Sequence, residues 1–161
     1  MKNSFALFKE TRPKKHLSQN FLADPHAKER ILSACQLKPN DVVLEIGPGT
    51  GALTRDLMTR VEKLYAIEAD SDLYKKLKED ITGEHFQLIH ADFLKYDLTS
   101  LPQGIKVIGN LPYHISTPII EKLIQMRSRI QHVFLTVQLE FGQRLAAQPH
   151  SKDYGALSCF V

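Results

Sequence analysis

The sequence has 161 residues with a formal net charge of +3; 43% of the residues are hydrophobic and 24% are charged. This length and composition are typical of one globular domain with its own core, and they exclude a fibrous or disordered chain. No run of 18 apolar residues occurs, and the first residues lack the apolar centre of a signal peptide. We therefore expect a cytoplasmic protein without a membrane-spanning helix.

The first segment, residues 1–24, carries an excess of positive charge. Up to His16 it holds five lysines or arginines against one acid, Glu10, and the rest of the chain is close to neutral. A basic arm ahead of a near-neutral domain suits contacts with phosphates. Many basic termini serve solubility alone, so both interpretations stay open on charge.

Helical and strand patterns alternate along the rest of the chain. Asp24 followed by Pro25 is typical of a helix start and predicts a helix over 25–36. Its expected inward positions are Ala27, Ile31 and Ala34. Strands are expected over 41–46, 64–68, 86–90, 105–109 and 132–137, and further helices over 51–60, from Ser71, over 117–126 and over 139–147. The alternation predicts an α/β domain with a mainly parallel sheet, whose ligand site lies beyond the carboxyl ends of the strands.

Cysteine and histidine usage argues against disulfides and metals. Cys35 and Cys159 lie far apart among apolar residues and form no CxxC pair, so we expect two buried thiols. The seven histidines are scattered without the spacing of metal ligands. The sequence therefore predicts no metal site.

The first expected strand runs into a glycine-rich stretch, EIGPGTG, over residues 45–51. Gly47, Gly49 and Gly51 permit a tight turn and a close approach of the backbone to a ligand. Glu68 ends the next strand, where a carboxylate can bind the two hydroxyls of a ribose. The pattern predicts a nucleotide-like ligand. Because it also satisfies the dinucleotide fingerprint, NAD and S-adenosylmethionine both remain candidates on these residues.

Two further acids at strand ends favour S-adenosylmethionine. Glu45 stands just before the glycines, where an acid disfavours a pyrophosphate but suits the ammonium group of a methionine moiety. Asp92 follows the third strand, where a carboxylate can accept a hydrogen bond from an adenine amino group. Together with Glu68, these acids favour the methyl donor over NAD.

The fourth strand leads into Asn110-Leu111-Pro112-Tyr113. Pro112 cannot donate to a sheet ladder and pushes Leu111 toward an extended conformation. Either the strand simply ends in a proline turn, or Asn110 and Tyr113 bind a planar, hydrogen-bonding group such as a nucleobase.

Seven segments in order resemble the ribosomal RNA adenine N6-dimethyltransferases, closest to the type that modifies small-subunit rRNA. They are KKHLSQNFLAD (14–24), VVLEIGPGTGALT (42–54), AIEAD (66–70), HADFLKYD (90–97), GNLPYHISTPI (109–119), TVQLEFGQRLAA (136–147) and YGALS (154–158). The resemblance implies a Rossmann-like class I S-adenosylmethionine-dependent methyltransferase fold. It also implies dimethylation of two adjacent adenosines, with rRNA in an immature small ribosomal subunit as the partner and neither a membrane nor a metal.

The resemblance and the chemistry of the residues together assign roles to individual positions. The expected cofactor contacts are Asn20, Leu22, Glu45, Gly47, Gly49, Gly51, Glu68, Asp92 and Asn110. The expected catalytic group is Asn110, Leu111, Pro112 and Tyr113. The side-chain oxygen of Asn110 and the backbone oxygen of Leu111 would accept the two N–H bonds of the target amine. Pro112 would fix that backbone oxygen, and Tyr113 would stack on the flipped base.

The same comparison defines expected domains and departures. Residues 1–24 would form the arm that contacts cofactor and RNA, and residues 25–161 an incomplete methyltransferase domain without the family's C-terminal helical domain. Ser18 stands where glycine is common and Leu139 where lysine is common; the second change removes a positive charge near the RNA side. A non-catalytic RNA-binding or ribosome-assembly factor, or an NAD-linked dehydrogenase, are the alternative functions.

Overall fold

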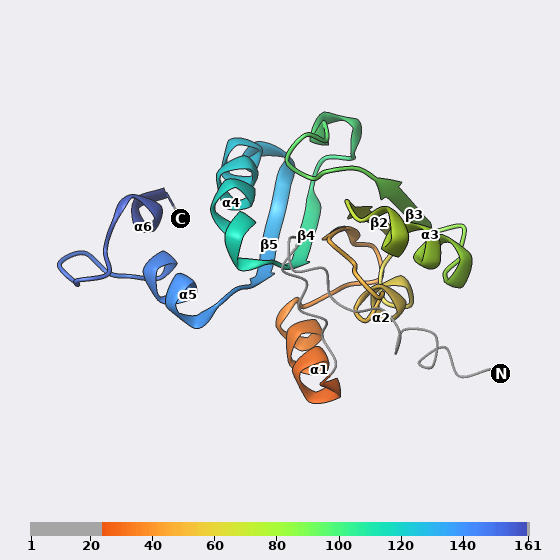
Figure 1. Ribbon diagram of the computed structural model, residues 1–161, viewed down its shortest axis with the longest axis horizontal. Helices are drawn as coiled ribbons and strands as arrows, with labels where there is room; N and C mark the ends of the chain where they lie inside the picture. Colours follow the sequence, from red (N-terminus) through yellow and green to blue (C-terminus); the bar gives the residue numbers. More distant parts are fainter. Residues whose placement is uncertain (1–23, 161) are drawn as a thin grey trace.

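The computed structural model describes residues 24–160, which form one parallel sheet with helices around it (Figure 1). The strands are β1 (Val42–Ile46), β2 (Lys63–Glu68), β3 (Phe86–His90), β4 (Ile105–Asn110) and β5 (Ile130–Thr136). Their order across the sheet is β3-β2-β1-β4-β5, and every neighbouring pair is parallel. The predicted α/β class and parallel sheet are therefore confirmed.

The register brings the carboxyl ends of the strands to one edge. Ile46 of β1 lies opposite Ile67 of β2 on one side and Gly109 of β4 on the other. Chain order runs outward from β1 in both directions, so the crevice between β1 and β4 is a topological switch point. Such crevices are where open α/β sheets bind ligands.

Helices cover both faces of the sheet. They are α1 (Pro25–Ala34), α2 (Thr54–Met58), α3 (Ser71–Asp80), α4 (Ser116–Gln125), α5 (Leu139–Leu145) and α6 (Ala156–Phe160), with 3₁₀ turns at Leu98–Ser100, Tyr113–Ile115 and Arg127–Arg129. α1 and α2 pack against one face and α4 against the other. α5 and α6 lie beyond β5, away from the sheet (Figure 1).

The core has one layer on each side of the sheet because strand side chains alternate between faces. Leu44 and Val107 belong to the layer under α4, and their neighbours Val43 and Ile108 to the layer under α1 and α2. All four are fully buried. Strands that are apolar on both faces are the sequence signature of a covered parallel sheet.

The start of α1 agrees with the sequence, and its inward face agrees in part, because Ile31 packs against the core and Ala27 is partly buried. Asp24 accepts a hydrogen bond from the His26 N–H at 2.9 Å and Pro25 is the first helical residue. The buried positions are Leu32 and Cys35, whereas Ala34 is exposed. Because each residue turns an α-helix by about 100°, Ala34 lies across the helix from Leu32, and the prediction that it points inward was wrong.

The expectation of two buried thiols is half correct. Cys35 is fully buried, whereas Cys159 is exposed and its thiol donates to the Tyr154 hydroxyl at 3.3 Å. Cys159 lies on α6, which packs against α5 rather than on the sheet. The apolar neighbours of Cys159 in sequence therefore do not place it in the core.

Candidate functional site

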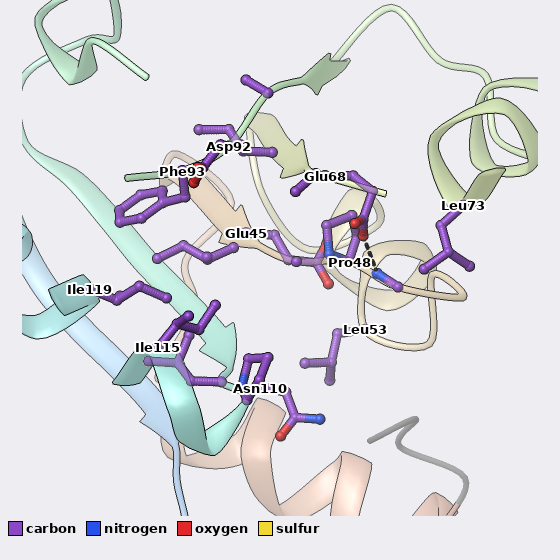
Figure 2. A pocket seen from close by; sticks show the side chains of 18 of the residues that line it. Glu45, Pro48, Leu53, Glu68, Leu73, Asp92, Phe93, Asn110, Ile115 and Ile119 are labelled. Atoms are coloured by element: carbon purple, nitrogen blue, oxygen red, sulfur yellow. Dashed lines mark hydrogen bonds between the residues drawn. The ribbon is translucent and has the colours of Figure 1, made fainter. Parts of the chain in front are cut away.

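A cleft opens at the carboxyl ends of β1, β2, β3 and β4. It contains about 1000 Å³ of empty space, part of it open to solvent, against about 240 Å³ for the smaller cavity at the other end of the sheet. Its walls come from the loop after β1, the ends of β2 and β4, residues 91–94 and the start of α4. Figure 2 shows Glu45 and Glu68 between Asp92 on one side and Asn110 on the other.

The glycine loop has the conformation that its composition predicts. Gly47, Gly49 and Gly51 have φ angles of 65°, 59° and 77°, in the left-handed region that side chains disfavour. A Cβ on Gly51 would also lie 2.8 Å from the Leu77 side chain. Three glycines in five residues are thus required by backbone geometry, and the loop can form a wall of the cleft without side chains that fill it.

Glu68 ties this loop to the end of β2. The side chain is almost fully buried; it accepts the Gly49 N–H at 3.0 Å through Oε2 and the Asp70 N–H at 2.8 Å through Oε1. Burial raises the pKa of Glu68 above its usual range, although the backbone donors of Asp70 and Gly49 act in the opposite direction. Each carboxylate oxygen can accept more than one hydrogen bond, so Glu68 can still bind hydroxyl groups in the cleft.

Glu45 is the most deeply buried acid of the cleft. It is 2% exposed, and the Thr54 hydroxyl donates to its Oε2 at 2.8 Å. Burial raises the pKa of Glu45 to about 7, the bond from Thr54 opposes the rise, and the charge of Glu68 adds to it. Sequence reasoning did not find Thr54. Its only signal was a hydroxyl residue in the first turn after the glycine loop.

Asp92 lies at the rim of the cleft in the loop after β3. Its Oδ1 accepts the Leu94 N–H at 2.9 Å. The side chain is 44% exposed. Lys122 of α4 holds the same loop: its Nζ donates to the carbonyl oxygens of Phe93, Leu94 and Tyr96 at 2.8, 3.0 and 2.5 Å. Neither Lys122 nor the buried Phe93, whose ring lies 5.3 Å from that Nζ, was found by sequence reasoning.

The segment after β4 is held rigidly at the cleft. Pro112, two residues beyond the end of β4, is extended, with φ −63° and ψ 140°. Its carbonyl oxygen accepts from the Ile115 N–H at 3.3 Å and the Ser116 hydroxyl at 2.9 Å. Asn110 and Leu111 line the cleft with Pro112, whereas Tyr113 is 56% exposed and is not part of the cleft wall.

The family model for ribosomal RNA adenine dimethylases matches residues 10–161. The chain belongs to this family. It is 43% identical to the ribosomal RNA small subunit methyltransferase A of Moorella thermoacetica over 92% of its own length and 56% of that protein. It therefore spans about half the length of the curated relatives it matches.

Solved structures place the fold in the same group. A dimethyladenosine transferase from Plasmodium falciparum superposes with a TM-score of 0.79 at 31% identity, over 88% of this chain and 52% of that one. The 23S rRNA methyltransferase ErmE superposes with a TM-score of 0.71 at 33% identity, over 84% and 53%. The predicted Rossmann-like class I methyltransferase fold is confirmed, and the cofactor of such enzymes is S-adenosylmethionine.

The residues of the cleft fit this cofactor better than NAD. Among residues 24–160, the cleft wall contains the acids Glu45, Glu68 and Asp92 but no lysine, arginine or histidine. An acidic wall suits a ligand with sulfonium and ammonium charges and opposes a pyrophosphate. In addition, the Gly49 N–H, which a phosphate would need, already donates to Glu68.

The remaining predictions concern the N-terminal segment, metals and membranes. Asn20 and Leu22 lie outside the described residues. Within residues 24–160 no group of three or more His, Cys, Asp or Glu side chains could hold a metal ion. No helix in that part of the chain is long and apolar enough to cross a membrane.

Proposed function

We propose that the protein carries out N6,N6-dimethylation of two adjacent adenosines in small-subunit rRNA, with S-adenosylmethionine as methyl donor. The observation that supports this proposal most is the position of Asn110 at the end of β4, across the cleft from the acids at the ends of β1 and β2 (Figure 2). A base amine held by Asn110 would face a donor held by those acids. Family membership supports the same activity.

The proposed cofactor contacts follow from the chemistry of each side chain. Glu68 accepts hydrogen bonds from the ribose hydroxyls and Asp92 from the adenine amino group, whereas Glu45 offsets the positive charge of the methionine moiety. Gly47, Gly49 and Gly51 have no side chains, so the ligand can approach the backbone of the loop closely. Asn20 and Leu22 complete the site from the N-terminal segment, as the family resemblance implies.

The chain's own residues would prepare the target nitrogen for attack. The adenine N6 amine is a poor nucleophile because its lone pair is delocalised into the ring. Oδ1 of Asn110 and the carbonyl oxygen of Leu111 each accept one N–H, which favours a pyramidal nitrogen whose lone pair points into the cleft. When bound, the cofactor supplies an electrophilic methyl group on a sulfonium. The protein then contributes position and electrostatics, and no side chain has to act as a general base.

The exposed ring of Tyr113 supports the recognition of a base outside its helix. A tyrosine that is 56% exposed beside the cleft offers a flat surface on which a flipped adenine stacks, at about 1–3 kcal/mol per base. The basic segment before residue 24 adds phosphate contacts. We place this activity in the cytoplasm on immature small ribosomal subunits, where it serves ribosome maturation.

The test uses the chain extended to the length of its curated relatives, labelled S-adenosylmethionine and small subunits that lack the modification. We expect dimethyladenosine at two adjacent positions, a reduction by orders of magnitude in Asn110→Ala, and a raised KM for RNA as the main effect in Tyr113→Ala. Residues 1–161 alone should bind the cofactor but methylate poorly. A folded, cofactor-binding extended chain that transfers no methyl group to adenosine would overturn the proposal and favour a non-catalytic assembly factor.

A further inference from the structure

Thr136 makes two contacts with the segment after β4. It is the last residue of β5 and lies directly opposite Asn110 in the register of the sheet. Its hydroxyl donates to Oδ1 of Asn110 at 2.6 Å, and its main-chain oxygen accepts the Leu111 N–H at 3.0 Å. One residue on the neighbouring strand thus holds both the side chain of Asn110 and the backbone that follows it.

The hydroxyl contact has a specific consequence for an asparagine. A side-chain amide has two orientations that exchange its oxygen and nitrogen, and only one of them offers an acceptor at a given point. A donor at 2.6 Å, at the short end of the range for O–H···O bonds, favours the orientation in which the oxygen remains next to Thr136. A carbonyl oxygen can accept two hydrogen bonds, so this bond is compatible with a second one from a substrate amine.

The fold itself does not require a hydroxyl at this position. Valine has the same branched shape and suits a strand at least as well as threonine. The Thr136 side chain is half-buried, and the one hydrogen bond of its hydroxyl within residues 24–160 is the bond to Asn110. The backbone contact with Leu111 would survive a change to valine, so the two contacts of Thr136 can be separated by mutation.

We propose that Thr136 is a positioning residue for methyl transfer: its hydroxyl fixes the Asn110 amide with the oxygen available to the target amine. This inference rests on the proposed function and adds a residue to its mechanism. Thr136 touches neither substrate nor cofactor in this scheme and acts through Asn110. Thr136 should therefore affect the rate of methyl transfer and not the affinity for the cofactor.

The experiment compares Thr136→Val with Thr136→Ser in the chain extended to the length of its relatives. For the loss of one hydrogen bond we expect kcat to fall about three- to tenfold in the valine variant, with the Kd for S-adenosylmethionine unchanged by calorimetry. Serine, which keeps the hydroxyl, should restore most of the rate. The control is Thr59→Val, which removes a hydroxyl that donates to the Asp56 carbonyl oxygen at the end of α2, and its kcat should equal that of the parent.

A double-mutant cycle separates positioning from general damage. In an Asn110→Ala background, Thr136→Val has no amide left to release, so the double variant should be as slow as Asn110→Ala alone. The side-chain amide NMR signals of Asn110, assigned by their loss in Asn110→Ala, should shift in Thr136→Val but not in Thr59→Val.

The outcomes distinguish this inference from the proposed function. An active parent whose Thr136→Val variant keeps full kcat, or leaves the Asn110 signals in place, would overturn the role of Thr136 and leave the activity standing. A parent chain that folds and binds the cofactor but transfers no methyl group would overturn both.

Discussion

The two ends of strand β1 carry buried acids in opposite electrostatic situations. At the amino end, Asp41 accepts from the Lys106 Nζ at 2.7 Å and from the Lys38 N–H at 2.6 Å. Burial alone would raise the pKa of Asp41, but the hydrogen bond and charge of Lys106 hold it below the usual range. At the carboxyl end, Glu45 has the Thr54 hydroxyl, and within residues 24–160 no cation pairs with it.

This difference distinguishes the structural end of the sheet from the functional end. The acid at the amino end is neutralised inside the fold by Lys106, which also donates to the Gln36 carbonyl oxygen and so ties the end of α1 to β4. The acid at the carboxyl end has a raised pKa of about 7 because it is buried and lies near the charge of Glu68, with the Thr54 hydroxyl acting in the opposite direction. An uncompensated buried charge costs stability. We interpret the loss of stability as a consequence of keeping an acid in place for a cationic ligand.

The largest effect is expected from removing the ion pair at the amino end of β1. Lys106→Met leaves Asp41 buried without its cation and should lower the free energy of unfolding by about 4 kcal/mol. The double variant Asp41→Asn/Lys106→Met removes both charges and should regain part of that loss. Urea unfolding curves measure all three proteins. A Lys106→Met chain as stable as the parent would show that the pair does not neutralise the amino end.

The next largest effect is the pH dependence of stability that Glu45 causes at the carboxyl end of β1. The pKa of Glu45 rises from 4.5 to about 7 on folding, so between these values the folded state binds more protons than the unfolded state. The contribution of Glu45 to the free energy of unfolding is fully present below pH 4.5 and is lost as the pH rises to about 7. This contribution is on the order of 3 kcal/mol. Glu45→Gln keeps the acceptor for Thr54 and should flatten this part of the profile. Equal pH slopes in the two chains would contradict the assignment.

Of the two ends of β1, only the carboxyl end should affect ligand binding. Glu68→Ala removes the acceptor expected for the ribose hydroxyls. It should weaken the binding of S-adenosylmethionine by ~1–3 kcal/mol in a calorimetric titration. Because Glu68 also accepts the Gly49 N–H, circular dichroism has to show that the variant remains folded. An unchanged Kd in the folded variant would reject Glu68 as the ribose ligand.

The smallest effect concerns the loop that carries Asp92. Lys122→Met removes a cation from three carbonyl oxygens and should weaken cofactor binding by about 1 kcal/mol, since the loop loses its anchor on α4. The control is Lys75→Met, an exposed lysine on α3 outside this loop, whose loss should leave the Kd unchanged. Equal losses in both variants would indicate a general charge effect instead.

Local patterns were sufficient for most of the fold. Each strand was predicted within two residues of its observed bounds, because apolar runs that are buried on both faces leave a strong signal. The glycine loop was also predictable, since Gly47, Gly49 and Gly51 all need φ angles that other residues disfavour. The helix after this loop begins at Thr54 rather than at 51, because the left-handed glycine and the turn that follows it delay the first helical residue.

Other features depended on tertiary structure because they join residues that are distant in sequence. The bonds from Thr54 to Glu45, from Thr136 to Asn110 and from Lys106 to Asp41 span 9, 26 and 65 residues. A hydroxyl or an ammonium group has no sequence pattern that names its acceptor. The partner becomes known only when parallel strands bring their ends to one edge. The sequence by itself determined which strands end in acids and amides, and the packing of those strands decided that Asp41 is neutralised by Lys106 while Glu45, Glu68 and Asn110 line the cleft.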